Sequence, residues 1–201
     1  MIDELLECWF GELDAGLCSP ARRRQLFRAD PDFDEALRAR FGAEVEAALA
    51  GERDHWGGSA RGRLALVLLL DQLPRNLFRG TPGAFAGDAA ALVQARRAVA
   101  AGQDRELPLE PRLFLYLPFE HAEDPGAQRE GIALLEGCRE EQRAGWEAAA
   151  VVDRYLGHAR DHAALIATFG RFPHRNDVLG RHHTEAERAH LARDARSFGQ
   201  G

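Results

Sequence analysis

The sequence predicts an all-α protein, and three features of the chain support this. Ala is common while Ile is rare and Val modest in number, a composition that favours helix over sheet. Apolar residues recur at helical spacing, as at Phe33, Leu37, Phe41 and Val45. Gly and Pro interrupt these segments at short intervals, so we expect roughly eight or nine helices with short connections. Such helices pack as antiparallel pairs, in a superhelix or a compact bundle, and the length suits a single domain over residues 1–201.

Local start and stop signals define the predicted elements. Asp30, Ser59 and Asp88 are expected to be N-caps, and Thr184 with Glu187 predicts a capping box. Helices are expected over 2–10, 20–28, 30–51, 59–73, 88–102, 109–117, 126–138 and 139–169, and from 184 onward, with a helical turn after 81–82. Segments 11–19, 103–107 and 171–183 are expected to be loops or links.

The segment 61–80 lies at the centre of the predicted fold. Leu64 to Leu70 is the most apolar run of the chain, and a helix that is apolar on every face is a buried one. Pro74 should end or kink this helix and leave Leu73 as its last residue. Polar side chains follow at once, and buried charges need partners. We therefore expect this segment to carry the centre of the core and the floor of a site.

Three segments share one pattern: an apolar helix end, a proline and then polar side chains. Pro74 marks the first, Pro118 closes the apolar run Leu109 to Leu117 in the second, and Pro173 marks the third. The predicted ligand-binding residues are Asp71, Gln72, Arg75, Asn76, Arg79, Glu120, His121, Glu123, His162, Arg171, His174, Arg175, Asn176 and Arg181. The first and third segments both contain Pro, then Arg-Asn, then a Gly/Arg pair, about 100 residues apart.

Two interpretations of these polar segments stay open. In the structural one, carboxylates neutralise the arginines and hold helix ends, with Asp71, Glu120 and Glu123 facing Arg75, Arg171 and Arg175. In the functional one, arginine and histidine side chains converge on a carboxylate or phosphate, because the planar guanidinium can bind two oxygens at once. The two interpretations are compatible with each other.

A metal site is the sharper alternative, and we do not expect one. His158 and His162 would share a helix face, and His121, Glu120, Glu123 or Asp161 could complete a site. The Glu of a His-Glu-x-x-His motif is absent, and paired histidines on an exposed helix are commonly accidental. His182-His183 is expected to be a solvated loop pair. The aromatic residues Trp9, Phe10, Phe27, Phe33, Phe41 and Trp56 are expected to pack in the core or between helices.

Composition excludes several classes of function. All 26 basic residues are Arg, so Schiff-base chemistry on Lys and a Walker-type phosphate loop are excluded. The three serines lie in no Gly-x-Ser-x-Gly motif, which argues against a serine hydrolase. The net charge of −6 argues against general nucleic-acid binding. No cofactor is predicted.

The remaining expectations concern compartment. The cysteines, Cys8, Cys18 and Cys138, are odd in number and widely spaced, which fits reduced thiols better than disulfides or a zinc ribbon. The N-terminus lacks the basic region of a signal peptide, and no apolar run has the roughly 18 residues of a membrane span. We therefore expect a cytoplasmic protein that contacts no membrane.

Four strings together resemble a known bacterial family. They are Trp9-Phe10-Gly11, Leu70 to Gly80, Leu115 to His121 and Phe169 to Asn176, and His162 also fits the pattern. In order and length they are similar to the family known as domain of unknown function 924, over nearly the whole chain. His158, the stretch 139–150 and His182-His183 depart from that pattern. The resemblance implies a tetratricopeptide-like, all-α fold and brings no established activity, substrate or catalytic residue.

Function is open between two hypotheses. The first is a helical binding module whose Arg- and His-lined pocket or groove takes an anionic small molecule or an acidic peptide. The second is a small-molecule enzyme in which His121 or His174 acts as general acid or base beside Asp71 or Glu120. In it, Arg75, Arg171 or Arg175 would hold an anion. The sequence does not decide the oligomeric state.

Overall fold

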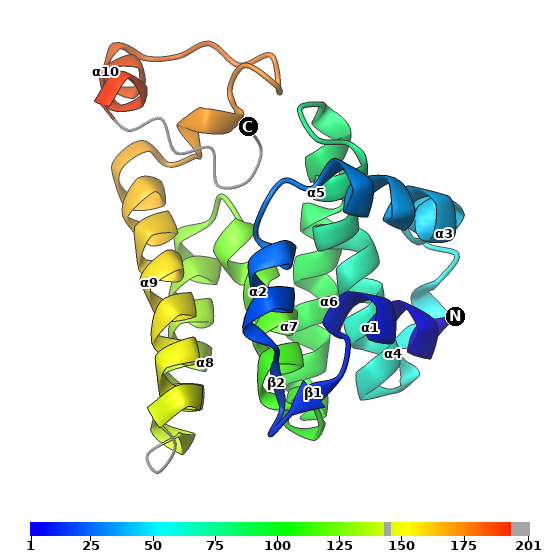
Figure 1. Cartoon of the computed structure of the whole chain (residues 1–201). Coiled ribbons are helices and arrows are strands. Elements are labelled where there is room, and N and C mark those ends of the chain that lie inside the picture. Colours follow the sequence, from blue (N-terminus) through cyan, green and yellow to red (C-terminus); the bar gives the residue numbers. More distant parts are fainter. Residues whose placement is uncertain (143–145, 194–201) are drawn as a thin grey trace.

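The computed structural model describes residues 1–142 and 146–193, and these are almost entirely helical (Figure 1). The α-helices are α1 (Ile2–Phe10), α2 (Pro20–Leu26), α3 (Pro31–Leu49), α4 (Ala60–Val67), α5 (Leu73–Leu77), α6 (Asp88–Ala100), α7 (Leu109–His121), α8 (Pro125–Glu141), α9 (Trp146–Phe169) and α10 (Glu185–Arg193). Short 3-10 turns η1 (Asp54–Gly58), η3 (Pro82–Phe85), η4 (Gln103–Glu106) and η5 (Pro173–Arg175) connect some of them. Because α4 and α5 form one continuous helix, the described chain has nine helices, and the predicted all-α class is confirmed.

Several predicted helix ends are confirmed in atomic detail. The Ser59 hydroxyl accepts a hydrogen bond from the Gly62 amide at the start of α4. The amide of Thr184 donates to the Glu187 carboxylate, and the Glu187 amide donates to the Thr184 hydroxyl, which is the predicted capping box of α10. These signals act within one turn, so sequence alone is sufficient to read them.

The predicted N-cap at Asp88 is wrong. Gly87 occupies the cap position of α6, and Asp88 is the first helical residue. A carboxylate in the first turn still suits the positive end of the helix dipole. The Asp88 side chain instead accepts hydrogen bonds from Arg75 and Arg175.

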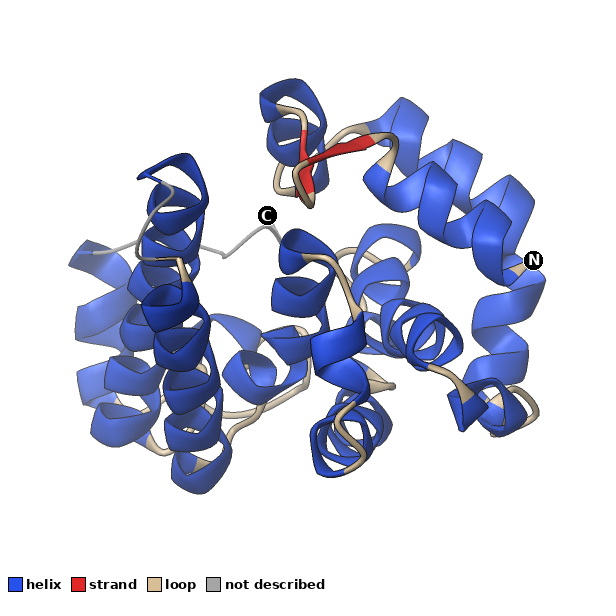
Figure 2. Ribbon diagram, turned by 90° about the horizontal axis from the view of Figure 1, so that it is seen from below, coloured by secondary structure: helices blue, strands red, loops and turns tan. Residues whose placement is uncertain are grey.

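A small hairpin occupies the predicted loop 11–19. Strands β1 (Leu13–Asp14) and β2 (Leu17–Cys18) pair antiparallel, and they are the red elements of Figure 2, seen from below. The Cys18 amide donates to the buried Glu110 carboxylate at 2.7 Å. Glu110 in turn accepts two hydrogen bonds from Arg23, so a buried ion pair ties the hairpin and α2 to α7.

Of the two predicted effects of Pro74, an end or a kink, the end at Leu73 is wrong, because the central helix continues past the proline. A π-helical segment, η2 (Leu68–Gln72), precedes it, and the Leu73 amide donates to the Leu68 carbonyl five residues back. The widened turn lets the chain pass the proline, which lacks an amide and would crowd a regular α-helix. The helix continues as α5. Residues 64–73 are fully buried, as expected for the centre of the core.

Pro118 does not close its helix either. It lies inside α7, which continues to His121 and is buried over almost its whole length. The α8–α9 hairpin packs against α7 on one side, as seen on the left of Figure 1. The predicted stretch 139–150 divides between the end of α8 and the start of α9, and residues 143–145 lie outside the described residues. No helix in the described chain combines the length and apolar character needed to span a membrane.

Candidate functional site

A cavity of about 400 Å³ lies where α2, α5, α9, η5 and the C-terminal end of α7 face one another. Its lining consists of polar and apolar side chains from these elements. They are Arg23, Arg24, Leu26, Phe27, Arg28, Gln72, Arg75, Asn76, Arg79, Phe85, Leu117, Glu120, His121, Arg154, Tyr155, His158, His162, His174 and Arg175. This size falls at the lower end of the range for small-molecule pockets, roughly 300–1,000 Å³.

The structure brings all three predicted polar segments to this region. Nine of the predicted residues lie in the lining: Gln72, Arg75, Asn76, Arg79, Glu120, His121, His162, His174 and Arg175. The others are Asp71, Glu123, Arg171, Asn176 and Arg181, and they lie outside it. Asp71 is the special case among these, because it is fully buried directly behind the wall.

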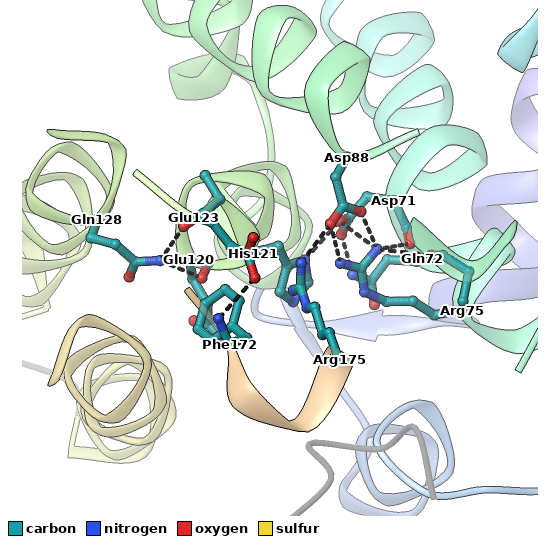
Figure 3. A network of polar contacts seen from close by, with 12 residues as sticks. Asp71, Gln72, Arg75, Asp88, Glu120, His121, Glu123, Gln128, Phe172 and Arg175 are labelled. Atoms are coloured by element: carbon teal, nitrogen blue, oxygen red, sulfur yellow. Dashed lines mark hydrogen bonds and ion pairs between the residues drawn. The ribbon is translucent and has the colours of Figure 1, made fainter. Parts of the chain in front are cut away.

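Asp88 joins the first and third segments (Figure 3). Its two carboxylate oxygens accept hydrogen bonds from Arg75 at 2.7 and 3.0 Å. One of them also accepts from Nη1 of Arg175 at 3.0 Å. A bidentate contact from a guanidinium to a carboxylate is a strong charge-assisted interaction. Asp88 is thus the shared anion of two buried arginines.

Arg175 is held by aromatic rings as well as by Asp88. Its guanidinium carbon lies 4.6 Å from the Phe85 ring centre and 4.4 Å from that of Phe172. Cation–π attraction strengthens when the groups are desolvated, and Arg175 is 6% exposed. Its Nε has no hydrogen-bond partner among the described residues. Burial lowers the pKa of Arg175 to about 10, so it stays charged at neutral pH.

Asp71 and His121 form a buried dyad. Nδ1 of His121 lies 2.6 Å from Oδ1 of Asp71, and the same oxygen lies 3.1 Å from Nη1 of Arg75. Oδ2 of Asp71 accepts a hydrogen bond from the side-chain amide of Gln72. Burial works against ionisation of Asp71, but the Arg75 charge and these hydrogen bonds hold its pKa below the usual range. An ionised Asp71 can only accept, so Nδ1 of His121 carries the proton. Nε2 of His121 then presents a lone pair, and within the described chain it makes no hydrogen bond.

Glu120 and His162 form a second buried pair, with Nδ1 of His162 3.4 Å from Oε1 of Glu120. The same nitrogen of His162 lies closer to the His158 carbonyl oxygen, at 2.9 Å, and forms its shorter hydrogen bond there. Burial and the nearby Asp71 charge raise the pKa of Glu120 to about 8. Burial and His121 lower the pKa of His162 to about 3. At neutral pH the pair is therefore a carboxylic acid beside a neutral imidazole, and it is not an ion pair.

The other histidines of the buried wall are neutral as well. Burial and the Arg175 charge lower the pKa of His174 to about 4. Burial and Arg75 also lower the pKa of His121. The full charges at the inner end are thus two anions, Asp71 and Asp88, and two cations, Arg75 and Arg175. They cancel one another.

The predicted residues outside the lining hold the third segment in place. Arg181 donates to the Glu123 carboxylate at 2.7 and 3.0 Å, and the same carboxylate accepts from the Phe172 amide. Arg171 pairs with Glu187 of α10 at 2.7 Å. Of the predicted pairings, Asp71 with Arg75 is present. The partners of Arg171, Arg175 and Glu123 differ from those expected, because distant elements supply them.

Two other predictions concern histidines and aromatic residues. His183 was expected to be solvated, but its Nδ1 lies 3.2 Å from the Asn176 amide nitrogen and its Nε2 lies 2.9 Å from Asp177. Phe27 was expected to pack in the core or between helices; its ring packs against Phe114 of α7 and Tyr155 of α9, while it is 46% exposed and lines the cavity. Among the residues that the structure describes, no three His, Cys, Asp or Glu side chains are placed to hold a metal ion.

Sequence reasoning missed the part of the lining that α2 and α9 supply. It comprises Arg23, Arg24, Arg28, Phe27, Arg154, Tyr155 and His158. The available signal was the run Arg22-Arg23-Arg24, an unusual density of charge in a short helix. On α9, Arg154, His158 and His162 are spaced by four, which places them along one helix face.

The comparisons with known proteins agree on a family. The model of the family described as "Bacterial protein of unknown function (DUF924)" matches residues 5–195. The chain belongs to this family. A solved structure described as "Protein of Unknown Function ATU0120 from Agrobacterium tumefaciens" is similar, with 36% identity and a TM-score of 0.79. The similarity covers 96% of this chain and 97% of the other. Among curated proteins the comparison found no match.

Neither relative carries a described activity, so this DUF924 protein is assigned a fold and a family but no reaction. The function must be argued from the cavity itself.

Proposed function

We propose that this DUF924 protein binds an anionic small molecule in the cavity. The observation that carries the proposal is the charge of the lining, which contains seven arginines and one carboxylate, Glu120. Since Glu120 has its pKa raised to about 8 by burial and by Asp71, the wall offers no full negative charge at neutral pH. A concave, partly apolar site of this size with several guanidinium groups suits a carboxylate or phosphate.

The arginines differ in how fully they are used. Arg23, Arg75, Arg79 and Arg175 are engaged by Glu110, Asp71, Asp88 and Asp34. Arg24, Arg28 and Arg154 are exposed, and no ion-pair partner for them exists in the described residues. Uncommitted guanidinium groups at a cavity support ligand binding over a purely structural role.

The same proposal includes the finer features expected from the sequence. A cavity of about 400 Å³ that several elements line favours a small molecule over an acidic peptide. We further propose a cytoplasmic location, one domain for the whole chain and a tetratricopeptide-like pairing of helices; each of these stays a prediction. The proposal requires no cofactor.

A second candidate is an enzyme that uses the same cavity for general acid–base chemistry. The Asp71–His121 contact of 2.6 Å favours it, because a carboxylate on Nδ1 orients the imidazole and supports the charge that forms when Nε2 accepts a proton. Turnover of a bound anion that is lost in His121→Gln, with binding retained, would support this candidate.

Binding is tested by a thermal-shift and calorimetry screen of mono- and dicarboxylates and organic phosphates. A ligand at about 100 times its Kd should add about 2.7 kcal/mol of stability. Arg154→Gln should weaken that ligand about tenfold, the effect of losing one charge-assisted hydrogen bond. Its melting temperature without ligand should stay unchanged.

Arg105→Gln is the matched control. Arg105 is also exposed and unpaired among the described residues, but it lies in η4, before the N-terminus of α7. Arg105 does not line the cavity, and the α7 residues that do, Leu117, Glu120 and His121, lie in the C-terminal half of that helix. Equal losses of affinity in Arg105→Gln and Arg154→Gln would mean nonspecific attraction and would contradict the proposed site.

A further inference from the structure

The cavity lining is divided into two zones by exposure. The lining arginines Arg24, Arg28 and Arg154 are exposed, and we call them the rim. Side chains of the inner end are buried: the exposed fraction is 13% for His121 and 9% for Glu120. Tyr155, Phe85, Leu26 and other apolar residues lie in the same lining.

The two zones select different chemical groups. The rim offers guanidinium donors that no carboxylate of residues 1–142 or 146–193 occupies, so it favours a full negative charge. At the inner end the arginines are already bound by Asp71 and Asp88, and their charges cancel. A second anion placed there would meet the Asp71 charge and the lone pair of His121, beside arginines whose charges Asp71 and Asp88 already balance.

The inner end instead matches a neutral hydroxyl. Nε2 of His121 is an acceptor without a partner in the described chain, because Asp71 fixes the proton on Nδ1. A hydroxyl group can donate to this nitrogen. The oxygen of the same hydroxyl can accept a hydrogen bond from the carboxylic acid of Glu120, which also lines the cavity.

The distance between zones sets the shape of the ligand. Arg154 and His162 lie eight residues apart on α9, about 12 Å along the helix axis. The ring centre of His162 lies 6.2 Å from that of His121. One atom or one bare phosphate does not span this length, so a body that contacts the apolar lining must connect the two polar ends.

We propose that the ligand is a hydroxylated organic acid with a single anionic group, with its phosphate or carboxylate at the rim arginines and its hydroxyl on Nε2 of His121. This inference rests on the proposed function and specifies its ligand class. It assigns separate tasks to Arg154 and His121. The rim arginine supplies affinity for the anion, and the dyad supplies selectivity for the hydroxyl.

The test uses matched probes that differ by one group. Phenylphosphonate, its 4-hydroxymethyl derivative and its 4-carboxy derivative are titrated by calorimetry, with benzoate and 4-(hydroxymethyl)benzoate as the carboxylate pair. The hydroxymethyl group should raise affinity roughly threefold to tenfold, the range for one neutral hydrogen bond. The 4-carboxy group should lower affinity. Stronger binding of the phosphonate pair or of the benzoate pair identifies which anion the rim prefers.

Variants separate the two tasks. Arg154→Gln should weaken both phosphonates by the same factor and leave their affinity ratio unchanged. His121→Gln should bring that ratio close to one. Because His121→Gln removes a partner of buried Asp71 and could unfold the protein, histidine ¹⁵N NMR of the unmodified protein provides a second measurement. The Nε2 resonance of His121 should move with the hydroxymethyl probe and not with phenylphosphonate.

The outcomes are distinguishable. If anions bind but the hydroxymethyl group has no effect, or the 4-carboxy probe binds most tightly, the two-zone assignment is overturned and the anion pocket stands. If no probe of either class binds, both proposals fail.

Discussion

Two segments of this protein, Leu73–Arg79 and Phe172–Arg181, each contain a proline followed by Arg-Asn, and they meet at Asp88. Both arginines also lie against the Phe85 ring, at 5.6 Å for Arg75 and 4.6 Å for Arg175. Similar residues thus reach the same carboxylate and the same ring from chain positions about 100 residues apart. The convergence is what closes one end of the cavity.

The two segments differ in what their other residues do. In the first, Arg75, Asn76 and Arg79 all line the cavity, because α5 and its last turn present them together. In the segment Phe172–Arg181, a 3-10 turn is followed by irregular chain, so Asn176 is buried and Arg181 pairs with Glu123. The same residue types line the cavity from a helix and form a structural clamp from a loop. Backbone geometry, rather than residue identity, decides between the two roles.

Removing the shared carboxylate should have the largest effect. Asp88→Asn removes the common anion of Arg75 and buried Arg175, and of these two only Arg75 keeps a second carboxylate, Asp71, in the described part of the chain. Breaking a buried ion pair typically costs about 3–5 kcal/mol. We expect a loss of this size in the free energy of unfolding, measured by urea denaturation.

Asp153→Asn is the control for that substitution, since it breaks the exposed pair with Arg139. Exposed pairs contribute about 0–1 kcal/mol. If the two variants lost equal stability, the convergence on Asp88 would not be a stabilising feature.

A smaller effect is expected where α6 meets the central helix. A Cβ atom on Gly87 would lie 2.1 Å from the Leu70 carbonyl oxygen, and backbone cannot yield as a side chain does. Gly87→Ala should cost roughly 1–3 kcal/mol, the range for overpacking, and should shift Asp88 away from both arginines. Circular dichroism melts measure the loss of stability.

Gly157→Ala gives the matched comparison. No atom lies within 4 Å of the added Cβ, and Gly157 is inside α9. This variant should gain roughly 0.5–1 kcal/mol, because alanine favours helix. A gain of stability in both variants would show that the Leu70–Gly87 approach is not tight.

The two segments also differ in a titratable group. His174 lies between Pro173 and Arg175, whereas Pro74 precedes Arg75 directly. The folded pKa of His174 is lowered to about 4 by burial and by Arg175, while an unfolded histidine titrates near 6.5. The unfolded state therefore binds more protons between these values. His174 makes its full contribution to the free energy of unfolding above pH ~6.5. That contribution is lost toward pH ~4, at up to about 1.4 kcal/mol per pH unit. His174→Gln should flatten this acid limb in denaturation curves measured from pH 4 to 7.

Glu120→Gln tests the loss of stability on the alkaline side of the pH profile. The folded pKa of Glu120 is raised to about 8 by burial and Asp71, while an unfolded glutamate titrates near 4.3. Here the folded state binds more protons, so stability falls as pH rises between these values. Glu120→Gln should remove the decline between pH 6.5 and 8. An unchanged decline would mean that Glu120 is already ionised at neutral pH.

The parts of the fold that could be predicted from the sequence are those that local signals specify. The caps at Ser59 and at Thr184–Glu187 act within one turn, so the sequence specifies them. A buried helix is likewise recognisable in the sequence as an apolar run. Pro74 misled the prediction because the compensating π segment has no residue signature of its own. Asp88 looked like a cap because its two partners are 13 and 87 residues away. The rim arginines were missed for a similar reason: exposed charges become a site only when the fold places them around a cavity.

The π segment before Pro74 has one more consequence. It adds one residue to the central helix relative to a regular α-helix, and one residue corresponds to about 100° of rotation about the axis. The direction in which Arg75, Asn76 and Arg79 project therefore depends on the phase that Leu68–Gln72 sets. Deleting any one residue there would keep the apolar composition nearly intact and turn the arginine wall away from Asp88. A length change in the core would be enough to remove Arg75 and Arg79 from the cavity lining.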